Sequence, residues 1–171
     1  MKKLILFLLI SFSFGAASAQ DRLTTIILVR HAEKGNDGTK DPDLNAAGIQ
    51  RAGALLEFLK QTELDAIYST EYKRTVNTVQ KVAVDHQLKL TSYKPFDLES
   101  FTKQLMKEAG KTILVVGHSN TIPNTINALI GEEKYQQLDD ADYDNLYVVT
   151  VSEGGEKVKV LEFQYGSPSG I

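Results

Sequence analysis

Two apolar runs that each end in a histidine constrain the fold of this chain most strongly. The first run, residues 24–29, is Thr-Thr-Ile-Ile-Leu-Val, and Arg30 and His31 follow it. The second run, residues 113–117, is Ile-Leu-Val-Val-Gly, and His118 follows it. Such runs are typical of strands buried in a parallel sheet. Because ligands bind beyond the carboxyl ends of these strands, two of the three histidines are predicted to meet at one crevice.

Short strand and helix patterns alternate over the rest of the chain. We expect strands at residues 24–29, 66–68, 88–92 and 112–116, and helices at residues 46–61, 71–85, 100–109 and 121–130. A hairpin is predicted within residues 145–163, because two strand patterns flank Glu153, Gly154 and Gly155. This order favours a three-layer α/β/α sandwich with a mainly parallel sheet and an antiparallel edge.

Apolar spacing and capping residues indicate how the four helices begin, end and pack. Asn45 is predicted to cap the first helix, and Gly110 and Gly131 to end the third and fourth. Pro123 fits the first turn of the fourth helix. The predicted buried faces are Ile49, Ala52, Leu55, Leu56 and Leu59 in the first helix, and Val76, Val79 and Ala83 in the second.

The N-terminal residues have the pattern of a signal peptide. Lys2 and Lys3 precede an apolar stretch at residues 4–14, and Ala-Ser-Ala at residues 17–19 fits a cleavage site. The stretch is shorter than the ~20 residues that a membrane span needs, and a retained anchor is the alternative. We therefore expect a signal peptide at residues 1–19, one domain at residues 20–171, no membrane anchor after cleavage, and a periplasmic or secreted protein.

The net charge and the lack of cysteine exclude some binding partners and some kinds of catalytic or metal site. The net charge is −3, and removal of the two N-terminal lysines makes it more negative. An acidic chain is a poor candidate for binding nucleic acid or an anionic membrane. The chain has no cysteine, which excludes a thiol nucleophile, a thiolate metal site and an acylated lipoprotein.

Basic side chains are predicted to converge on the crevice. If the strands are parallel neighbours, Arg30, His31 and His118 meet there with Arg74 from the helix after the second strand. Guanidinium groups bind phosphate bidentately, and helix N-termini add backbone N–H donors. The alternatives are that Arg74 is a solvated helix residue and His118 a helix cap. A phosphate pocket explains all four residues together.

Four blocks in the same order resemble the histidine phosphatase (phosphoglycerate mutase-like) superfamily. They are Leu-Val-Arg-His-Ala-Glu at residues 28–33, Asp-Leu-Asn-Ala-Ala-Gly with Arg-Ala at 43–52, Tyr-Ser-Thr with Arg-Thr at 68–75, and Gly-His-Ser-Asn at 117–120. The resemblance extends over nearly the whole mature chain, and the chain is most similar to short exported members. It implies the phosphoglycerate mutase-like fold.

The resemblance also implies the site residues. His31 is the nucleophile that becomes phosphorylated, and Arg30, Arg74 and His118 hold the phosphoryl group. Ala32 stands where many relatives have glycine. The residues agree with this chemistry, because an imidazole with a pKa of ~6.5 is a usable nucleophile at neutral pH. Fixed cations stabilise the transition state, so we expect no metal and no other cofactor.

The preferred proton donor is predicted from the region between Arg74 and His118. In larger family members an acidic residue lies between the second arginine and the second histidine. Asp97 is our choice here, because an N-cap position on the next helix would hold it near the crevice; Glu99 and Glu33 are the alternatives. A capping role alone explains Asp97 equally well.

Other polar residues are interpreted as structural. The acidic run at residues 139–144 lacks the glycine and distal glutamate of an EF-hand loop, so a solvated loop is favoured over a cation site. His86 follows a helix end, where a cation is favourable. Ser69 and Thr70 are expected to act as caps.

The sequence therefore predicts an exported phosphohydrolase that acts on a small phosphorylated molecule. A mutase is disfavoured, because the chain has little material for a lid that excludes water. The alternatives are a protein that binds phosphate or phosphoesters without turnover, and a phosphohistidine protein phosphatase.

Overall fold

The two runs that end in histidine form neighbouring parallel strands. The computed structural model describes residues 22–170, so the predicted signal peptide lies outside the described residues. β1 (Leu23–Arg30) pairs with β4 (Thr112–Gly117), and Arg30 lies opposite Gly117. On the other side of β4 lie β2 (Ala66–Ser69) and β3 (Leu90–Ser92), also parallel. The carboxyl ends of these strands therefore share one edge of the sheet.

The predicted hairpin completes the sheet at its other side. β5 (Asn145–Ser152) is antiparallel to β1, and β6 (Val158–Gln164) is antiparallel to β5. The strand order is β3-β2-β4-β1-β5-β6. The mainly parallel sheet with an antiparallel edge is confirmed.

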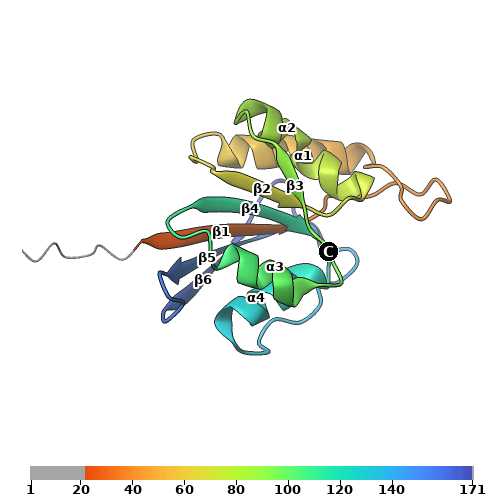
Figure 1. The fold of residues 1–171 in the computed structure, drawn as a ribbon. Coiled ribbons are helices and arrows are strands. Elements are labelled where there is room, and N and C mark those ends of the chain that lie inside the picture. The colour runs from red at the N-terminus through yellow and green to blue at the C-terminus, as the bar shows by residue number, and fades with distance from the viewer. Residues whose placement is uncertain (1–21, 171) are drawn as a thin grey trace, which may run out of the picture.

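Two pairs of helices cover the two faces of the sheet. Figure 1 shows α1 (Ala46–Leu59) and α2 (Lys73–Asp85) on one face, and α3 (Leu98–Leu105) and α4 (Thr121–Ile130) on the other. The three-layer sandwich is confirmed. None of the helices in the described part of the chain has the length and apolar character to cross a membrane.

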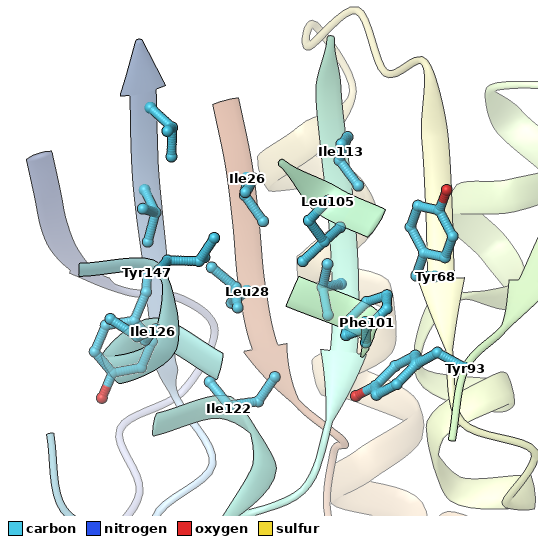
Figure 2. Close-up of a cluster of buried hydrophobic side chains, with 14 residues drawn as sticks. Ile26, Leu28, Tyr68, Tyr93, Phe101, Leu105, Ile113, Ile122, Ile126 and Tyr147 are labelled. Atoms are coloured by element: carbon cyan, nitrogen blue, oxygen red, sulfur yellow. The ribbon is translucent and has the colours of Figure 1, made fainter. Parts of the chain in front are cut away.

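Alternation along the strands builds a core on each face. Ile26 and Leu28 of β1 pack with α3 and α4 in the cluster drawn in Figure 2, whereas Ile27 and Val29 pack with α1 and α2. Successive strand residues point to opposite faces, so a continuous apolar run is required where both faces are covered. This double burial holds the strand ends that carry the candidate site.

Ala52, Leu55 and Leu59 are buried in α1 as predicted, whereas Leu56 is half-buried and Ile49 is exposed. Asn45 caps the helix, and its side chain accepts a hydrogen bond from the Gly48 amide. The buried positions follow the i, i+4, i+7 spacing from Gly48, so Ile49 lies off the stripe and is 53% exposed. Gly48 itself contacts a loop closely, since a Cβ there would lie 2.2 Å from the Glu33 carbonyl oxygen.

The other helices also correct the prediction in detail. In α2 the residues Val79 and Ala83 are buried as predicted, but Val76 is only half-buried. α3 begins directly after Asp97 and ends at Leu105, not at residue 109. The amides of Lys107 and Glu108 bond to carbonyls only three residues back, so tight turns replace the helix before Gly110. Gly131 ends α4 in the left-handed conformation, as predicted.

Candidate active site

The four predicted phosphate-binding residues meet at the carboxyl edge of the sheet. Arg30, His31, Arg74 and His118 all line one cavity of about 370 Å³. The remaining residues that line it are Lys34, Tyr72, Pro95, Phe96, Ser119, Asn120, Thr121 and Asp140. The structure therefore brings together side chains from two strand ends and one helix, as the parallel pairing of β1 and β4 requires.

His31 is held as a neutral imidazole with a defined tautomer. Its Nδ1 atom lies 2.8 Å from the carbonyl oxygen of Ala32, and its backbone N–H donates to the Gly117 carbonyl. A carbonyl only accepts, so Nδ1 carries the proton and Nε2 keeps its lone pair. Burial lowers the pKa of His31 to about 3, and the charge of Arg30 contributes in the same direction.

A chain of hydroxyl groups orients His118. The Thr75 hydroxyl donates to the Tyr72 carbonyl over 2.7 Å, and its oxygen lies 2.8 Å from Thr70 Oγ1. Thr70 Oγ1 is in turn 3.0 Å from His118 Nε2. In this order each oxygen accepts from the next group, so Nε2 carries a proton and Nδ1 is available to a ligand. Burial lowers the pKa of His118 to about 4, with a further contribution from Arg74.

Thr70 therefore has a different role from the predicted cap. The N-cap residue of α2 is Tyr72, and it makes no side-chain capping bond. The Ser69 hydroxyl donates to the Thr70 carbonyl. Neither hydroxyl caps the helix; Thr70 supports the imidazole of His118.

Arg30 is held by the acidic segment at residues 139–144, which sequence reasoning interpreted as a solvated loop. Nη1 of Arg30 donates to the carbonyls of Asp139 at 2.6 Å and Asp142 at 2.7 Å. The Tyr143 ring lies 4.1 Å from the guanidinium carbon, and Asp144 is buried. The solvated-loop interpretation is confirmed for Asp139, Asp140 and Ala141, which are exposed. It is incomplete, because backbone carbonyls and the Tyr143 ring of this segment contact Arg30.

Arg74 lies against the cavity from α2. Its guanidinium carbon is 4.3 Å from the centre of the Tyr72 ring, and Nη1 is 3.5 Å from a carboxylate oxygen of Asp41. The side chain is only 14% exposed, so it is not a solvated helix residue. The Nε atoms of Arg30 and Arg74 are both buried, with no hydrogen-bond partner among the described residues. Buried donors of this kind call for a ligand or another explanation.

The three candidate proton donors do not line the cavity. Asp97 caps α3 as predicted, its carboxylate accepting from the Ser100 amide, and it is exposed. Glu99 pairs with Lys103 on the outer surface of the same helix. Glu33 accepts from Arg51 Nε and Nη2 at 2.7–3.0 Å.

Two further contacts fix the turn after His31. The Ala32 amide donates to Thr78 Oγ1 of α2 over 2.9 Å. Arg51, which is 4% exposed, joins Glu33 to the carbonyls of Tyr165 and Ser167 near the C-terminus. Within residues 22–170 no group of three or more His, Cys, Asp or Glu side chains is placed to hold a metal ion.

Comparison with known proteins shows a similarity in sequence over part of the chain and a similarity in fold over most of it. The model of the histidine phosphatase superfamily (branch 1) matches residues 26–96, a span that contains Arg30, His31 and Arg74. Over this span, which is less than half of the chain, the sequence is similar to that superfamily. The matching histidine phosphatase model ends before His118, which the fold brings to the same cavity.

Named phosphatases are similar to this chain, one in sequence over a short span and two in fold. Phosphoserine phosphatase 1 of Hydrogenobacter thermophilus is 39% identical over 67 residues, which span 36% of this chain and 32% of that protein. A mycobacterial glucosyl-3-phosphoglycerate phosphatase superimposes with a TM-score of 0.67 at 14% identity, covering 86% of this chain and all of the other. The protein histidine phosphatase SixA complexed with tungstate gives a TM-score of 0.66 at 16% identity, covering 82% and 96%.

Proposed function

We propose that this chain hydrolyses phosphomonoesters through a phosphohistidine formed at Nε2 of His31. The observation that carries the proposal is the convergence of Arg30, Arg74 and His118 on one cavity beside the neutral imidazole of His31. Two fixed cations suit a phosphoryl group. A protein histidine phosphatase of the same fold has been observed with tungstate, which is also a tetrahedral oxyanion.

The first step transfers the phosphoryl group to His31. Nε2 attacks phosphorus, the P–N bond forms, and the bond from phosphorus to the ester oxygen breaks. Because Nδ1 donates to the Ala32 carbonyl, the positive charge that develops on the ring is stabilised at the far nitrogen. The low pKa of His31 means that no proton has to be removed before attack at neutral pH.

Charge stabilisation and proton delivery fall to the other three residues. Arg30 and Arg74 face the oxygens of the transferring group, which carry most of the transition-state charge. A bound phosphate dianion raises the pKa of His118 from its low value, because an opposite charge favours the protonated ring. We propose that His118 donates the proton to the leaving oxygen, because binding of the substrate favours the protonated form of this imidazole.

Water completes the reaction. Attack of a water molecule on the phosphohistidine breaks the P–N bond and releases inorganic phosphate, with His118 accepting a proton from the water. Hydrolysis is favoured over transfer to a second alcohol, since the chain has little material for a water-excluding lid. We place the protein outside the cytoplasm, in the periplasm or the medium, on the pattern of residues 1–19.

A steady-state assay separates a phosphatase from a protein that only binds phosphoesters. The purified protein is expected to turn over p-nitrophenyl phosphate, with the same rate after treatment with EDTA, and to be inhibited by vanadate. A panel of alkyl phosphates and a phosphohistidine peptide then ranks the substrate classes. Binding of phosphate without any turnover would favour the non-catalytic alternative, and loss of activity on chelation would contradict the metal-independent mechanism.

A further inference from the structure

A second cavity adjoins the one that contains His31. It has a volume of about 630 Å³, and Tyr72, Pro95 and Phe96 line both cavities. Asp41, Glu71 and Tyr93 are among the residues that line only the second. Its volume lies within the range of small-molecule sites. A molecule bound across the shared rim would therefore have its phosphate in one cavity and its remaining atoms in the other.

Phe96 stands on this rim as an exposed ring in a fixed segment. It is 84% exposed. On one side of it, Tyr93 is buried, stacks on Phe101 at 4.0 Å, and donates from its hydroxyl to the Val116 carbonyl (Figure 2). On the other side, Asp97 caps α3. Because both neighbours are anchored, the backbone of this segment is held in place, and binding of a ligand costs mainly the side-chain freedom of the ring.

Tyr72 forms the wall between the two cavities. Its ring is edge-on to His118, with 5.1 Å between the ring centres, and the Arg74 guanidinium lies over it at 4.3 Å. Both phosphate-site residues therefore fix the position of Tyr72. Tyr72 and Phe96 therefore place two aromatic side chains where the two cavities adjoin.

The charges of the two cavities differ. The first is lined by Arg30, Lys34 and Arg74 with one carboxylate, that of Asp140. The second is lined by the carboxylates of Asp41 and Glu71 and by Lys94. The Asp41 charge is partly offset by Arg74 at 3.5 Å. A second anionic group on the substrate would lose water without gaining a set of cations like that of the phosphate cavity. The apolar rings favour an uncharged group.

We propose that the second cavity binds the alcohol part of the substrate, and that Phe96 and Tyr72 select phosphomonoesters with an uncharged aromatic ring next to the ester bond. The proposal rests on the proposed function, because it places the phosphate between Arg30 and Arg74. An aromatic contact with the rim strengthens binding of such esters relative to small alkyl esters.

Two pairs of probes test the selection separately from turnover. Benzyl phosphate and ethyl phosphate have leaving groups of similar basicity, and benzylphosphonate and ethylphosphonate are analogues that cannot be hydrolysed. The wild-type protein is expected to prefer the benzyl member of each pair by about tenfold or more, in kcat/KM and in Kd. Phe96→Ala should remove most of that ratio. Phe163→Ala, which truncates another exposed phenylalanine on β6, should retain it.

The phosphonate pair keeps the two proposals distinguishable. If no ester is hydrolysed but benzylphosphonate still binds more tightly in a Phe96-dependent way, the aromatic subsite stands and the phosphatase proposal fails. Equal binding of the two phosphonates overturns the subsite; a protein partner or a second copy seated on Phe96 would give that result. Loss of the ratio in Phe163→Ala as well would also overturn it.

Discussion

The imidazole rings of His31 and His118 lie 5.4 Å apart, edge to face, although 86 residues separate them in the chain. Each follows the end of a buried strand, and the parallel pairing of β1 with β4 sets the two ends side by side. The arrangement places one ring with a free Nε2 beside a second ring that hydroxyl groups orient.

The two rings are expected to stay neutral in the free protein. Burial lowers the pKa of His31 to about 3 and that of His118 to about 4. Ring-proton NMR signals of both residues, assigned with His31→Gln and His118→Gln, should therefore shift little between about pH 5 and about pH 8. Titration of both rings near the ordinary value of ~6.5 would contradict the buried, desolvated site.

Acid stability follows from the same shifts. Both pKa values are lower in the folded chain than in the unfolded chain. Between about pH 6.5 and about pH 3 the unfolded chain therefore binds more protons, and the folded chain loses stability as the pH falls through this range. His31→Gln should reduce the pH dependence of the unfolding free energy by up to about 1.4 kcal/mol per pH unit in that range. Denaturant unfolding at several pH values measures the slope, and an unchanged slope would refute the assignment.

Arg74 is expected to contribute strongly to catalysis, whereas its neighbour is not. Arg74→Gln removes one of the two fixed cations and should lower kcat about 10²-fold or more. Lys73→Gln is the matched control, because Lys73 is exposed and does not line the cavity. Steady-state kinetics on one ester compares the two variants. Similar losses in both would mean that general surface charge, not a bound phosphoryl group, explains the effect.

Asp97 should behave as a helix cap. Asp97→Asn is expected to keep nearly all activity on alkyl and aryl esters, since asparagine caps as well as aspartate, while Asp97→Ala should lower stability by about 1 kcal/mol. A loss of about 10²-fold or more in Asp97→Asn on alkyl phosphates alone would restore Asp97 as the proton donor. The comparison of the two ester classes decides between the roles.

The buried Arg51–Glu33 pair should stabilise the turn after His31. Arg51→Met leaves Glu33 without its cation and frees two carbonyls near the C-terminus, so a loss of about 3 kcal/mol is expected. Arg22→Met, which breaks the exposed pair with Glu153, should change stability little. Urea unfolding measures both. Equal small effects would show that the turn does not depend on this pair.

The site residues at the ends of strands could be predicted from the sequence, because the apolar runs show where each strand ends. Arg30, His31 and His118 are of this kind. The segment at residues 139–144 could not be predicted, since it acts on Arg30 through backbone carbonyls, which every residue carries. Its acidic side chains suggested a solvated loop.

Side-chain contacts between residues far apart in the chain also could not be predicted from the sequence. Thr70 was expected to cap a helix because threonine caps often do, and only the register of β2 beside β4 shows that it meets His118. Similarly, the i, i+4 face of α1 is set by the close approach of Gly48 to the Glu33 loop, so Ile49 is left outside. Periodicity places Ala52, Leu55 and Leu59 on the buried face correctly, but it does not show which residue of the first turn is buried.

Trapping the phosphoenzyme tests the central claim most directly. Wild-type protein mixed with a phosphomonoester and quenched in alkaline denaturant should carry phosphate that is stable to base, labile to acid, and located on His31 by peptide mass analysis. His86→Gln, which changes the third histidine, should label in the same way, and His31→Gln should not label and should lose at least ~10³-fold of kcat. Phosphate on another residue, or turnover near the wild-type rate in His31→Gln, would contradict the account.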